Sequence, residues 1–147
     1  MIAETRDRPL AYRLRERVLA WLEAQRDGQR EGQRDGQRDG QSSSASATNA
    51  DLPRIEPVVC SDLWYLNARE LEERPAIAIG EPGTNAATAV ISSRLPTAFV
   101  IEQSLRVHLD PEFIDLRAAL WGANSAATAA AIDLFAERYM DDFLGAA

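Results

Sequence analysis

The stretch AIAIGEPGTNAATAVISSRL, residues 76–95, is the part of the sequence that decides the fold. Its apolar run 76–79 ends at Gly80, and a turn containing Gly and Pro leads into the Ala-rich run 86–95. This order predicts a strand, a tight turn and a helix, which is the unit of an α/β sheet. The same order returns at AALWG, residues 118–122, which a second Ala-rich run follows.

Length and composition favour one hydrophobic core. The chain has 147 residues, of which 46% are hydrophobic, and this suits one ordinary domain. Its net charge is -7, and residues 51–147 hold seven Arg against fifteen acidic residues. Because an acidic surface repels phosphate backbones, we expect no nucleic-acid partner. The chain has no Lys, which excludes a Schiff-base lysine and the lysine of a P-loop.

Single Cys and His residues limit the possible chemistry further. With only Cys60 and His108, the chain can form no intramolecular disulfide and no zinc site built from several Cys and His ligands. Arg residues interrupt the N-terminal region, which therefore does not resemble a secretory signal, and no apolar run is long enough to span a membrane. We therefore expect a cytoplasmic protein without a metal centre.

The first 25 residues predict an amphipathic helix. Asp7 or Thr5 can cap it, and Pro9 suits its first turn. Apolar residues recur every fourth position and form one stripe, which consists of Leu10, Leu14, Val18 and Leu22. A short isolated helix is marginal in water, so either the rest of the chain or another chain must cover the stripe. We expect the helix at 9–25 to bind a protein partner or a second copy, or to dock in cis.

Low-complexity sequence separates this helix from the remainder. From Arg26 to Gln41 the tetrapeptide RDGQ repeats with one Glu-for-Asp exchange, and a Ser/Ala/Thr/Asn tract follows. Such a segment has almost nothing to bury, which predicts a disordered linker over residues 26–51 and an α/β domain over 52–147.

The remaining elements of that domain follow from local patterns. Residues 55–60 predict a short strand, residues 63–66 a strand or covering loop, and Asn67 with Glu70 forms a capping box for a helix that stops at Pro75. Two strands then follow, at 98–101 and 105–109. In the second, Leu and Val alternate with Arg106 and His108, which predicts one buried and one solvated face, and we expect His108 on the solvated face. The strand ending at Trp121 should pair antiparallel with it, and a last helix should run over 125–143.

Together these elements predict an α/β fold with two or three layers. The sheet should be mixed and mostly parallel, with a separate N-terminal amphipathic helix.

The turns that precede the two Ala-rich helices are the best ligand-site candidates. Backbone N–H groups at a helix start can bind an anion, and in open α/β sheets ligands lie beyond the carboxyl ends of the strands. The expected ligand-binding residues are Gly80, Gly83, Thr84, Asn85, Gly122, Asn124 and Ser125. The alternative is that Asn and Ser serve only as helix caps.

Four further residues are weak catalytic candidates. Cys60 could act as a nucleophile with His108 as its base, although a lone Cys in an apolar run is usually a core residue. Asp62 and Glu81 each follow a predicted strand and could form a carboxylate pair, although both could equally be solvated loop acids.

Residues 79–85, IGEPGTN, and the later WGANSAATAAA, residues 121–131, resemble paired strand-to-helix turns of S-layer-type and cell-wall-binding surface domains. The resemblance implies a non-catalytic packing module. Glu81 stands where those domains carry a second glycine.

A non-enzymatic interaction or assembly module is therefore the leading functional hypothesis, with no cofactor. The alternative is a small nucleotide- or phosphoester-handling enzyme that uses the Gly80–Asn85 turn with a magnesium ion, because the acids near that turn would otherwise repel a phosphate.

Overall fold

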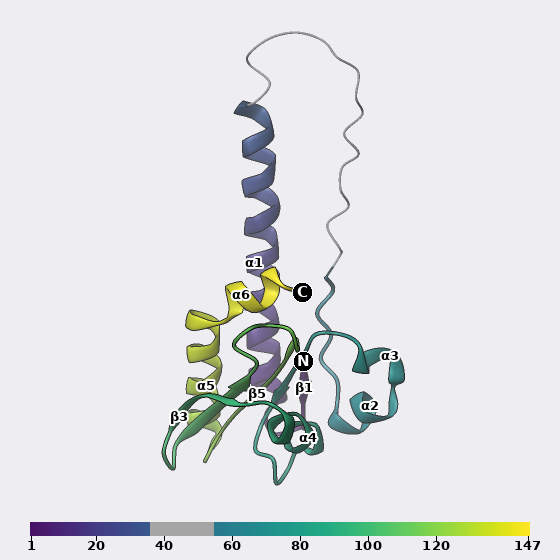
Figure 1. Ribbon diagram of the computed structural model, residues 1–147, viewed down its shortest axis with the longest axis vertical. Helices are drawn as coiled ribbons and strands as arrows, with labels where there is room; N and C mark the ends of the chain where they lie inside the picture. Colours follow the sequence, from purple (N-terminus) through teal and green to yellow (C-terminus); the bar gives the residue numbers. More distant parts are fainter. Residues whose placement is uncertain (36–54) are drawn as a thin grey trace.

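The computed structural model describes residues 1–35 and 55–147, and it is built on one five-stranded sheet (Figure 1). The strand order is β1-β2-β5-β4-β3, in which β1, β2 and β5 run parallel and β4 and β3 run antiparallel to their neighbours. The strands are β1 (Ile2–Ala3), β2 (Ala76–Ile79), β3 (Thr97–Ile101), β4 (Leu105–Leu109) and β5 (Arg117–Gly122). The expected mixed α/β sheet and the antiparallel pairing of β4 with β5 are confirmed, with two parallel and two antiparallel strand pairs.

Helices cover both faces of the sheet and form three layers. The helices of the first face are α1 (Arg8–Asp35), α5 (Ser125–Arg138) and α6 (Met140–Gly145), and those of the second are α2 (Asp62–Asn67), α3 (Arg69–Glu72) and α4 (Ala86–Arg94). Alternate strand residues serve the two faces. Ile77 and Ile79 pack toward α1 and α5, whereas Ala76 and Ala78 pack toward Ala87 of α4. Because these residues are small, α4 can lie close to the sheet.

The N-terminal segment belongs to this core and is not a separate unit. Residues Ile2–Ala3 form an edge strand, and α1 then buries Ala11, Leu14 and Val18 against α5 and α6. The apolar stripe is thus covered in cis. The helix also continues past residue 25 to Asp35, into the predicted linker, and rises beyond the rest of the fold (Figure 1). The remainder of that linker and the domain start at residue 52 lie outside the described residues.

Three local predictions were wrong. Residues 63–66 lie in helix α2, because the Ser61 hydroxyl accepts a hydrogen bond from the Trp64 N–H at 3.3 Å and begins a helix there. Asn67 ends α2 and is not the cap of the next helix: its side chain donates back to the Leu63 carbonyl at 2.7 Å. Of residues 55–60, only Cys60 pairs with a strand, through a bridge to Ile2.

Two further expectations also need correction. The last helix breaks at Tyr139, which separates α5 from α6. His108 is buried, with 7% of its surface exposed, because its side of β4 is covered and its ring lies beside Thr97 of β3. Burial lowers the pKa of His108, an effect that the Leu95 carbonyl opposes and that Arg106 reinforces.

Candidate functional site

The carboxyl ends of the parallel strands form the edge where the sequence-predicted site lies. Helices α1, α4 and α5 begin just beyond β1, β2 and β5, and α4 leaves on the opposite face from the other two. The two glycine turns are neighbours there, since the Gly80 N–H donates to the Leu120 carbonyl of β5 at 3.0 Å. This is the kind of edge at which α/β proteins bind ligands.

Asn85 is the central side chain of the first turn. It is 1% exposed, and its Oδ1 accepts a hydrogen bond from the Thr88 N–H at 3.0 Å as the N-cap of α4. Its amide nitrogen donates to the Ile79 carbonyl at 3.0 Å and to the Ile2 carbonyl at 3.3 Å. Asn85 therefore ties the ends of β1 and β2 to the start of α4, and its hydrogen bonds are all made within the protein.

The carboxylate of Asp62 reaches the same helix start. Its Oδ2 accepts a hydrogen bond from the Ala86 N–H, the first residue of α4, at 2.8 Å, and its Oδ1 accepts one from the Leu63 N–H at 2.6 Å. Burial alone would raise the pKa of Asp62, but these hydrogen bonds, led by the one from Ala86, lower it below its ordinary value. The position where an external anion would meet α4 is thus filled by a carboxylate of the protein itself.

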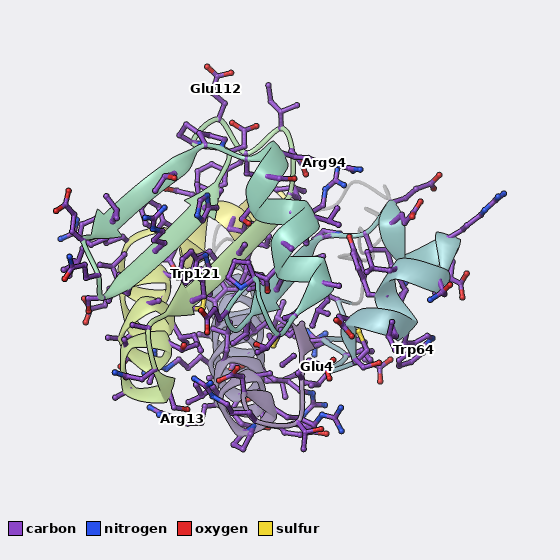
Figure 2. The ribbon with its side chains drawn as sticks, turned by 90° about the horizontal axis from the view of Figure 1, so that it is seen from below. Glu4, Arg13, Trp64, Arg94, Glu112 and Trp121 are labelled. Atoms are coloured by element: carbon purple, nitrogen blue, oxygen red, sulfur yellow. The ribbon has the colours of Figure 1, made fainter. Side chains whose placement is uncertain are left out.

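Two more acids complete this edge, and the sequence analysis did not assign them to it. Glu4 lies between α4 and α1 (Figure 2), and its Oε1 accepts a hydrogen bond from the Asp62 N–H at 3.2 Å. Asp7 is 2% exposed, and its Oδ1 makes no hydrogen bond to any described residue, although the Arg6 guanidinium lies 3.8 Å away. Burial raises the pKa of Asp7, the Arg6 charge opposes this, and the Glu81 charge adds to it. Both acids follow β1, a strand of only two residues that the sequence does not reveal, so their place at this edge could not be read from the sequence.

The exposed part of the first turn holds the other predicted residues. Glu81 and Thr84 face solvent, and the Thr84 hydroxyl donates to the Glu81 carbonyl at 3.1 Å. A Cβ added at Gly83 would meet no atom of the described residues within 4 Å. The structure therefore brings Asp62 and Glu81 to one turn, but the two acids occupy different environments, one buried and hydrogen-bonded, the other exposed.

The second turn is tightly packed. A Cβ at Gly122 would lie 2.5 Å from the backbone of Ala127, and the Gly122 N–H donates to the Thr128 hydroxyl at 3.1 Å. Asn124 caps α5 by accepting a hydrogen bond from the Ala127 N–H at 2.9 Å, and Ser125 is the exposed first residue of the helix. Close packing of α5 on β5 accounts for this glycine.

The structure does not bring Cys60 and His108 together. Cys60 is bridged to β1 at one side of the sheet, and His108 lies in β4 near the other side. Four strand spacings separate them, or about 19 Å at ~4.8 Å per spacing. Burial raises the pKa of the Cys60 thiol, which opposes formation of a thiolate.

The described acidic side chains at this edge do not form a set of metal ligands. Among residues 1–35 and 55–147, no group of three or more His, Cys, Asp or Glu side chains is arranged to hold a metal ion. Comparison with protein-family models, with curated proteins and with solved structures gave no match. The resemblance to S-layer-type domains stays a prediction.

A different part of the sheet presents an open surface. Strand β3 is the last strand of the sheet and pairs only with β4 among the described strands. Its residues Val100 and Ile101 are 47% and 48% exposed, and consecutive residues of a strand point to opposite faces. β3 thus offers apolar side chains on both faces, beside backbone groups that β4 does not satisfy.

Proposed function

We propose that the protein is a non-enzymatic assembly module in which the free edge of β3 pairs with β3 of a second copy. The observation that carries this proposal is the position of β3 at the end of the sheet with Val100 and Ile101 exposed. An edge strand has a row of unpaired N–H and C=O groups, and pairing with another strand satisfies them.

The second copy is favoured over an unrelated strand because the surroundings of β3 are self-complementary. Arg94 precedes β3 and Glu102 follows it, and both are exposed. In an antiparallel two-fold pair, the end of each strand lies near the beginning of its partner. Opposite charges would then approach each other at both ends of the new ladder, and the apolar side chains of the two strands would pack beside each other.

The sequence hypothesis placed association on the helix at 9–25. The burial of Leu14 and Val18 within the chain leaves that helix with one large exposed apolar residue, Tyr12, which is 51% exposed. The assembly role is therefore retained as the proposed function, with β3 in place of the helix at 9–25 as the contact surface. No helix in the described part of the chain is long and apolar enough to cross a membrane, and the cytoplasmic location remains a prediction.

Sedimentation velocity over a range of protein concentrations tests this proposal. We expect the full chain to form a dimer as concentration rises, and Val100→Lys to weaken that dimer at least about tenfold, because two like charges would meet across the new pair. Ile114→Lys and Tyr12→Lys are the matched controls. Both replace a large exposed apolar residue away from β3, and both should leave dimerisation unchanged.

The variants separate the possible interfaces. A wild-type chain that stays monomeric at every concentration contradicts the proposal. A dimer that survives Val100→Lys and is lost in Tyr12→Lys would place the interface on α1 and also contradict it. Circular dichroism of each variant checks that the fold is retained.

A further inference from the structure

A cavity of about 340 Å³ lies beside β1 and the amino end of β2, at the opposite end of these strands from the glycine turns. Its walls come from α1, the segment 55–60, α3, β2 and α6. In Figure 1 this is the region where the start of β1 lies below the end of α6. The volume falls within the range of small-molecule sites, roughly 300–1,000 Å³.

The interior of this cavity is apolar. It is formed by aliphatic and aromatic side chains from five separate elements, namely Ile2, Val18, Leu71, Ile77, Phe143 and Leu144. Most of them are buried core residues, so the walls are held by the packing of the sheet and helices. A site of this kind removes an apolar ligand from water, which supplies the main part of the binding free energy.

Met1 lines the cavity and its terminal ammonium donates a hydrogen bond to the Val58 carbonyl at 2.6 Å, and two charged side chains of the described residues lie at the cavity margin. Arg74 and Glu56 line it and are both exposed. Within residues 1–35 and 55–147, Arg74 makes no ion pair and no side-chain hydrogen bond. A guanidinium at the entrance of an apolar cavity suits a planar carboxylate, which it can bind through two parallel hydrogen bonds.

We infer that this cavity binds a small apolar molecule that carries one carboxylate, such as a medium-chain fatty acid. The hydrocarbon part lies among Val18, Ile77 and Leu144, and the carboxylate lies at Arg74. No residue of β3 lines this cavity, so ligand binding here can be tested separately from dimerisation through β3.

Cys60 provides a reporter inside the site. Cys60 is one of the residues that line the cavity, and it is the only cysteine of the chain, so any thiol modification of the protein reports on this position. A ligand that occupies the cavity blocks access to the sulfur atom and slows its reaction with a small uncharged thiol reagent.

The test uses decanoate as the probe and decanol as its neutral control, with the full-length chain. Isothermal titration should show one decanoate bound per chain, with decanol binding about three- to fivefold more weakly, as expected for an exposed ion pair. Decanoate should also slow modification of Cys60 by N-ethylmaleimide. Arg74→Gln should weaken decanoate binding by the same factor and remove the preference over decanol. Glu56→Gln should strengthen decanoate binding, because it removes a like charge.

Each outcome decides the inference. Equal affinity of decanoate and decanol for the wild-type chain, or unchanged decanoate affinity in Arg74→Gln, overturns the assignment of the carboxylate. No binding of either probe overturns the site itself, as does binding that leaves the Cys60 reaction rate unchanged. Leu144→Trp, which fills the cavity, should abolish binding. If that variant fails to fold, the decanoate affinities of Arg74→Gln and Glu56→Gln still test the site.

Discussion

Gly80→Ala probes the contact between the end of β2 and the start of α1. Gly80 has a φ of +113°, a backbone conformation that residues with a side chain rarely adopt, and such strain costs about 1–3 kcal/mol. An added Cβ would also lie 2.6 Å from Asp7 Oδ2, and Asp7 is buried and cannot easily turn away. Overpacking of this kind costs about 1–3 kcal/mol more. We therefore expect a loss of about 3 kcal/mol in the free energy of unfolding, or a Tm lower by about 10 °C.

Thermal unfolding by circular dichroism measures this loss. Gly83→Ala is the control in the same turn, because no atom of residues 1–35 or 55–147 lies within 4 Å of its added Cβ, and it should change stability by less than about 0.5 kcal/mol. The double variant Asp7→Ala/Gly80→Ala separates the two causes. Removing the Asp7 carboxylate relieves the clash but not the backbone strain, so Gly80→Ala should cost roughly half as much in that background. A Gly80→Ala variant as stable as Gly83→Ala would refute the reasoning.

Three further predictions concern the polar groups at the same edge. Asn85→Ala should lower the free energy of unfolding by about 2–4 kcal/mol in urea denaturation, because it removes a buried helix cap together with two hydrogen bonds to strand carbonyls. Asn124→Ala, which removes a more exposed cap, should cost only about 1 kcal/mol, and equal losses would argue against the bridging role of Asn85. The folded-state pKa of Asp7 is raised, so its ionisation destabilises the fold as pH rises through that pKa, and Asp7→Asn should gain Tm relative to the wild type between acidic and neutral pH. The folded-state pKa of Asp62 is lowered, so the ionised carboxylate stabilises the fold above the unfolded pKa, and this stabilisation is lost as pH falls through the folded pKa. In a plot of the free energy of unfolding against pH, Asp62→Asn should therefore make the decrease toward acidic pH less steep. An equally steep decrease in the variant would contradict this.

The sequence predicted the central sheet well because its signals are local. The runs at 76–79 and 118–121 are apolar, each ends in glycine, and each is followed by an Asn-capped Ala-rich helix. Strand, turn and helix are all determined within these few residues, so the two turns could be placed together at the carboxyl edge. The alternation in 105–109 likewise gave the buried face of β4.

Elements that depend on distant contacts were missed. A two-residue strand such as β1 has no sequence signal of its own and forms because Cys60 and β2 lie on either side of it. The solvated position expected for His108 assumed an uncovered face, but Thr97 of β3 and the Leu95 carbonyl in the connection from α4 lie beside the His108 ring. The occupant of the candidate anion site was missed for the same reason. Asp62, which accepts a hydrogen bond from the Ala86 N–H there, lies more than twenty residues before α4 in the chain.

Hydrogen exchange of the β3 amides at increasing protein concentration tests the assembly proposal most directly. Within an isolated chain, β4 pairs one edge of Thr97–Ile101 and leaves the alternate amides open to solvent. The account predicts that those alternate amides become protected as concentration rises, in step with dimer formation, while the amides around Tyr12 keep their rates. Dimer formation without any change in β3 exchange, or β3 exchange that is independent of concentration, would contradict it.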